Sequence, residues 1–112
     1  MAFDLRNRHC APCPPGTPAL RGPELASWTA ELPGWEVVDQ HHLRREYRFP
    51  DFLTALSFVN RIAEVAEAEQ HHPDLTLSWG RVVVETYTHS IGGLSANDFI
   101  LAARIEALPR PA

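Results

Sequence analysis

Two stretches of alternating apolar and polar residues, each doubled back on a short turn, are separated by a segment with the periodicity of a helix. In the first stretch, residues 35–49, the polar pair Asp39-Gln40 interrupts the alternation. In the second stretch, residues 75–88, Gly80 does the same. Because so few residues join the two strands of each pair, both pairs must be antiparallel hairpins; a parallel connection needs about a dozen residues or more.

Three further segments have helical character. Residues 51–69 carry an apolar stripe at helical spacing, and a shorter helix is expected behind Pro23. A last helix is expected over residues 96–108, where Ser95 and Asp98 have the spacing of a capping box. The order α-β-β-α-β-β-α predicts an α+β fold, with a four-stranded antiparallel sheet and its helices packed on one face.

Length and charge limit what such a fold can do. A chain of 112 residues, 45% of them hydrophobic, can form one core but not two. Residues 1–20 hold four of the ten prolines and are expected to be a Pro-rich lead-in to a single domain over residues 21–112. A net charge of -4 provides no basic surplus for a nucleic-acid backbone, and no apolar run is long enough for a membrane helix. We therefore expect a cytoplasmic protein with neither a nucleic-acid nor a membrane partner.

Three of the six histidines are predicted to meet at one end of the second hairpin. His71 and His72 precede its first strand and His89 follows its second, and antiparallel pairing makes these two ends neighbours. Imidazole both gives and takes protons near neutral pH, so two such rings around a pocket can act as acid and base. Asp98 could hold one ring in a fixed tautomer. Trp79 could form a flat wall for a ligand, although the alternation favours a place in the core.

Two metal sites are alternatives at this point. His71, His89 and Asp98 have the composition of a site with two histidines and one carboxylate for iron. A second set offers three soft ligands for zinc and needs a fourth: His9, Cys10 and Cys13. We interpret the remaining histidines as solvated loop residues: His9, His41 and His42.

The spacing around the histidine cluster is specific. Three residues separate Glu67 from His71-His72-Pro73, five more lead to Trp79, nine more to His89 and eight more to Asp98. This pattern resembles the signature of the pterin-4a-carbinolamine dehydratases. Further segments resemble bacterial members of that family: residues 32–35, 43–49, 88–89 and 92–99.

The resemblance implies an enzyme, a 4a-hydroxytetrahydrobiopterin dehydratase (hydro-lyase). Such an enzyme converts 4a-hydroxytetrahydropterin to quinonoid dihydropterin plus water by histidine acid/base catalysis, and so recycles the cofactor of aromatic amino acid hydroxylases. The pterin is the substrate, and the reaction needs neither a cofactor nor a metal. The implied catalytic residues are His71, His72 and His89. The implied substrate contacts are these three with Pro73, Thr88 and Ser90, and the supporting residues are Glu67, Trp79 and Asp98.

Family members associate, so a homodimer or homotetramer is implied here, through an exposed sheet edge or an apolar helix face. Some relatives serve as binding proteins. The alternative function is therefore a protein-interaction or assembly-factor module on the same fold.

Overall fold

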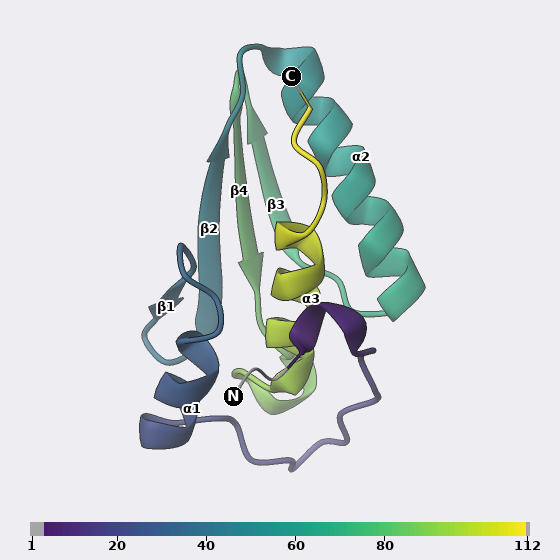
Figure 1. The fold of residues 1–112 in the computed structure, drawn as a ribbon. Helices are drawn as coiled ribbons and strands as arrows, with labels where there is room; N and C mark the ends of the chain where they lie inside the picture. Colours follow the sequence, from purple (N-terminus) through teal and green to yellow (C-terminus); the bar gives the residue numbers. More distant parts are fainter. Residues whose placement is uncertain (1–3, 112) are drawn as a thin grey trace.

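The computed structural model describes residues 4–111 and contains a four-stranded antiparallel sheet with helices on one face (Figure 1). The elements are η1 (Leu5–Asn7), α1 (Gly22–Thr29), β1 (Glu36–Val38), β2 (His42–Arg48), α2 (Phe52–Glu69), β3 (Asp74–Ser78), β4 (Arg81–Thr86), η2 (His89–Ile91) and α3 (Ala96–Glu106). Both predicted hairpins form, and β2 pairs with β4 to join them in the order β1-β2-β4-β3. The predicted α+β fold is confirmed.

The helix ends follow from local chemistry. The Asp51 carboxylate accepts the Thr54 N–H at 2.8 Å and caps the start of α2. At the other end Gln70 adopts a left-handed conformation, with φ of 53°, and turns the chain out of the helix. The first helix, α1, ends at Thr29, and Leu32 is buried just beyond it.

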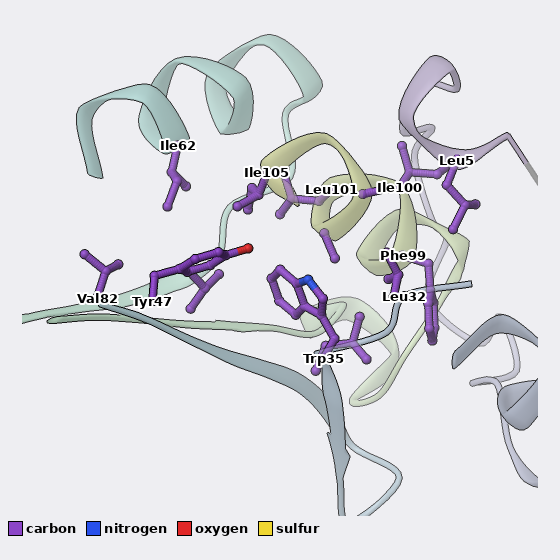
Figure 2. Close-up of a cluster of buried hydrophobic side chains, with 14 of the residues drawn as sticks. Leu5, Leu32, Trp35, Tyr47, Ile62, Val82, Phe99, Ile100, Leu101 and Ile105 are labelled. Carbon is purple, nitrogen blue, oxygen red and sulfur yellow. The ribbon is translucent and has the colours of Figure 1, made fainter. Parts of the chain in front are cut away.

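The inner face of the sheet packs against α2 and α3. Alternation along β4 turns Val82 and Val84 inward, and both are fully buried. Figure 2 shows the core between sheet and helices, with Tyr47 of β2 facing Ile62 of α2 and Ile105 of α3 nearby. This packing fixes α2 and α3 against the sheet, and the ends of these elements carry the candidate site.

The opposite face of the sheet is charged. Arg44, Arg48 and Arg81 all approach Glu46 within 3.8 Å or less. No apolar stripe is available there for a second layer of helices, which explains why the helices lie on one face.

The turn between β3 and β4 corrects one expectation. Because β3 ends at Ser78, Trp79 lies in the turn, and its side chain is 72% exposed. The prediction that Trp79 packs in the core is wrong, since the alternation that supported it stops one residue earlier.

The N-terminal lead-in packs along the domain (Figure 1). Leu5 is buried in the core, and the Leu20 N–H donates to the Leu94 carbonyl at 2.8 Å. Between these points the chain crosses the end of the sheet where β4 stops. Among the helices of residues 4–111, none combines the length and the hydropathy that a membrane span requires.

Candidate functional site

A pocket of about 690 Å³ opens at the end of the sheet where β4 stops and β3 begins. This volume falls in the range of small-molecule sites, about 300–1,000 Å³. Three chain segments and one helix residue line it: Cys10 to Cys13, Ala68 to His72, Tyr87 to Ser90, and Asn97. The predicted residues His71, His72 and His89 therefore lie around one pocket.

His71 is placed by the end of α2 and held by α3. The turn at Gln70 brings its backbone N–H to the Ala66 carbonyl at 3.2 Å. Its Nε2 lies 2.7 Å from Oδ1 of Asp98, and the two side chains are 12% and 0% exposed. An ionised carboxylate only accepts hydrogen bonds, so Nε2 carries a proton. Nδ1 is then the ring nitrogen left to exchange a proton with a ligand.

Asp98 is held by more than the imidazole. The Thr86 hydroxyl donates to Oδ1 at 2.7 Å, and the Thr88 hydroxyl donates to Oδ2 at 2.8 Å. The Ser95 N–H donates to Oδ2 at 3.0 Å, which completes the predicted capping box of α3. Four donors therefore stabilise a fully buried carboxylate, and their fixed positions orient the ring of His71.

The other two histidines are more open. His72 is exposed, and its Nε2 contacts the Glu67 carboxylate at 2.5 Å. His89 is exposed at the start of η2, on the segment that follows β4. Glu67 thus supports His72, as the spacing implied, but it does not belong to the pocket lining.

Several predicted contacts differ in detail. Thr88 and Ser90 line the pocket, but the Thr88 hydroxyl is engaged with Asp98, and the Ser90 hydroxyl donates to the Cys13 carbonyl at 2.8 Å. Pro73 is not among the lining residues. Trp79 lies at the opposite end of the β3–β4 hairpin and forms no wall of this pocket.

Sequence reasoning missed the wall formed by residues 10–13, which with His9 we call the strap (residues 9–13). Asn97 in the first turn of α3 clamps the strap, since its amide oxygen accepts the Ala11 N–H at 3.0 Å and its amide nitrogen donates to the Ala11 carbonyl at 2.6 Å. Glu69 at the end of α2 holds it as well, by accepting the Cys10 N–H at 2.7 Å and contacting His9 Nδ1 at 2.9 Å. A glutamate on the otherwise apolar face of α2 was the one available sequence signal.

Two groups with shifted pKa values lie where the strap meets the end of α2. Burial acts to raise the pKa of Glu69, but the hydrogen bonds from Cys10 and His9, with Arg104 nearby, outweigh it and hold this pKa below its usual value. Burial raises the pKa of Cys10 to about 12, and the Glu69 and Asp98 charges add to the rise. The Cys10 thiol is therefore protonated and unreactive near neutral pH.

Of the remaining histidines, only His9 is a solvated loop residue. His9 is exposed but bound to Glu69. His41 and His42 are half-buried, with their Nδ1 atoms 3.1 Å apart. The interpretation as solvated holds for His9, whose side chain is 77% exposed, and it is wrong for His41 and His42, which are half-buried and contact each other.

Neither metal set suggested by the sequence is assembled. Within residues 4–111 no three His, Cys, Asp or Glu side chains are grouped so that they could hold a metal ion. His71 and Asp98 bond to each other directly, and His89 is not their third partner.

Comparisons with known proteins all indicate the same family. The family model described as Pterin 4 alpha carbinolamine dehydratase matches residues 18–108. A Rubrobacter xylanophilus protein, provisionally named pterin-4-alpha-carbinolamine dehydratase, is 50% identical over 105 residues, which cover 94% of this chain and 98% of that protein. A Rickettsia bellii protein with the same provisional name is 48% identical over 109 residues, 96% of each chain.

A solved structure agrees with these relatives. The crystal structure of a transcriptional coactivator/pterin dehydratase from Brucella melitensis has a TM-score of 0.75 and 33% identity, and the match covers 80% of this chain and 97% of that one. The family predicted from the histidine spacing is thus confirmed, together with the dehydratase class of enzyme. This chain belongs to the pterin-4-alpha-carbinolamine dehydratase family.

Proposed function

We propose that this chain dehydrates 4a-hydroxytetrahydropterin to quinonoid dihydropterin plus water by histidine acid/base catalysis. The observation that carries the proposal is one pocket lined by His71, His72 and His89, with His71 bonded to a buried carboxylate. In a cell the reaction would return the cofactor of aromatic amino acid hydroxylases to its cycle.

The chemistry needs two proton transfers. The C4a–O bond breaks as an imidazolium protonates the leaving hydroxyl, so that water departs instead of hydroxide. The N5 lone pair forms the C4a=N5 double bond, and a base takes the N5 proton. We assign these steps to the pair His71 and His89, with His72 contacting the substrate. The elimination is redox-neutral, so we propose no redox cofactor.

In the proposed reaction, Asp98 stabilises the protonated form of His71. A neutral His71 offers the Nδ1 lone pair as a base, and after it takes up a proton its imidazolium is stabilised by the Asp98 charge 2.7 Å from Nε2. Burial of Asp98 strengthens this effect, because water does not screen the pair.

The test is the rate of elimination with synthetic 4a-hydroxytetrahydropterin. We expect the full chain to accelerate loss of the 4a-hydroxyl well above the spontaneous rate at neutral pH. A rate equal to that of buffer alone would reject the proposal.

We also propose that the chain acts in the cytoplasm as a homodimer or homotetramer. Among residues 4–111, three large apolar residues are exposed, namely Phe52 (43%), Leu53 (74%) and Trp79 (72%). Strand β3 is an edge strand with one side unpaired by other strands. Light scattering on purified protein tests this proposal, and a monomer at micromolar concentration would contradict it.

A further inference from the structure

The last residue of β4 and the residues that follow it alternate between two environments. Thr86 and Thr88 turn inward and donate to Asp98, and both are buried. Residues two apart in an extended segment share a side, so Tyr87 and His89 lie together on the other side. Their rings stack with centroids 4.1 Å apart and planes 26° apart.

This stack is what orients the His89 side chain. Within the part of the chain that the structure describes, the His89 imidazole makes no hydrogen bond and no ion pair, and its one ring contact is with Tyr87. His71 differs from His89, because the His71 imidazole is held by its hydrogen bond to Asp98. A ring held by nothing would sample its rotamers freely and would rarely lie in one plane.

The ring of Tyr87 is itself packed against a second histidine ring. The ring of His41 lies 4.3 Å from that of Tyr87. Two rings so near a third cannot share one face of it without touching, and His41 makes no ring contact with His89, so they lie on opposite sides of the phenol. His41 Nδ1 is 3.1 Å from His42 Nδ1, and His42 Nε2 is 3.2 Å from the Glu85 carboxylate. Tyr87 is therefore clamped, although it is only half-buried.

We propose that Tyr87 is a positioning residue that fixes the plane of the His89 imidazole through ring stacking. This inference rests on the proposed function, because it assigns a role to Tyr87 through His89. The ring, not the hydroxyl, carries the effect. Orientation of an acid or base matters because a misplacement of about 1 Å can cost on the order of 10²-fold in rate.

The kinetic test compares Tyr87→Leu with Tyr87→Phe, which keeps the ring and removes the hydroxyl. We expect Tyr87→Leu to lower kcat about 10-fold with KM changed less than about twofold, and Tyr87→Phe to stay within about twofold of wild type. In a His89→Ala background, Tyr87→Leu is expected to cause no further fall, because the ring it orients is gone. A fall of equal size in that background would show that Tyr87 acts on the substrate directly and would overturn the inference.

A spectroscopic readout keeps the inference testable whatever Tyr87→Leu does to folding. In the wild-type chain the ring-current field of Tyr87 should move the His89 ring protons upfield in the NMR spectrum, and Tyr87→Phe should preserve that shift. His89 ring protons at random-coil positions in wild type would overturn the inference. If the wild-type chain shows no dehydration at all while the upfield shift is present, the proposed function has failed and the stacking geometry has not.

Discussion

His71 Nε2 lies 2.7 Å from Oδ1 of Asp98, a carboxylate that solvent does not reach. The two residues come from different elements: the loop after α2 carries the imidazole, and the first turn of α3 carries the carboxylate. The same carboxylate caps α3 and receives two threonine hydroxyls. Structure and proposed chemistry therefore depend on one side chain.

Asp98→Asn should lower both the stability of the fold and the catalytic rate. An amide presents one donor group among four donors, so at least one hydrogen bond is lost, and the free energy of unfolding should fall by about 1–3 kcal/mol. Loss of the charge beside His71 should lower kcat by on the order of 10²-fold or more. Urea denaturation and steady-state kinetics measure the two effects. Asp74→Asn, an exposed carboxylate at the start of β3, is the matched control and should leave both unchanged.

His71→Ala and His89→Ala distinguish catalysis of the dehydration from binding of a protein partner. Each should lower kcat by about 10²- to 10⁴-fold, because each removes a proposed proton-transfer group. His89 is exposed, so its replacement should change the free energy of unfolding by less than about 0.5 kcal/mol. If the chain works instead as an interaction or assembly module, both variants will keep their partner in a pull-down and leave cellular phenotypes intact.

Glu69→Gln should flatten the response of stability to acid. The folded-state pKa of Glu69 lies below the ordinary value of 4.5, so its stabilisation is present above pH 4.5 and is lost as pH falls through the folded-state pKa. Unfolding midpoints in urea should therefore differ between wild type and Glu69→Gln at neutral pH and converge in acid. Glu64→Gln, an exposed change on the same helix, should track wild type throughout. A gap that is constant down to pH 2 would contradict the assignment.

Cys10 should resist alkylation. With a pKa of about 12, its thiolate fraction at pH 8 is roughly three orders of magnitude below that of an ordinary cysteine. Timed iodoacetamide treatment followed by peptide mass spectrometry gives the alkylation rate of Cys10. The same treatment of the chain unfolded in urea gives the reference rate. Equal rates in the folded and unfolded chain would show that the strap does not bury Cys10.

The periodicity of the apolar residues was enough to predict the helices and strands. It also predicted the end of the hairpin at which the histidines gather. The alternation around Gly80 and the apolar stripe of residues 51–69 are local signals, and Pro73 marks where the helix must have ended. The pairing of β2 with β4 is a contact between residues far apart in the chain, and no local pattern encodes it.

What sequence reasoning missed depends on long-range contacts or on a single residue at a boundary. Glu69 stands out as a glutamate on the apolar face of α2, but its partner, the strap about 60 residues away, is evident only from the structure. Tyr87 looks like a strand aromatic until its ring is found against His89. Trp79 was misplaced because alternation cannot tell the last residue of a strand from the first of a turn.

The strap lies mostly outside the core of the fold, and yet it supplies one side of the pocket. In the proposed mechanism, proton transfer is thereby assigned to the histidines at the end of the sheet and to Asp98 of α3, and the shape of the ligand site to a few residues near the N-terminus. Rewriting Ala11 and Pro12 could consequently tune which pterin substituents fit, with no disturbance to the hydrogen bonds that orient His71.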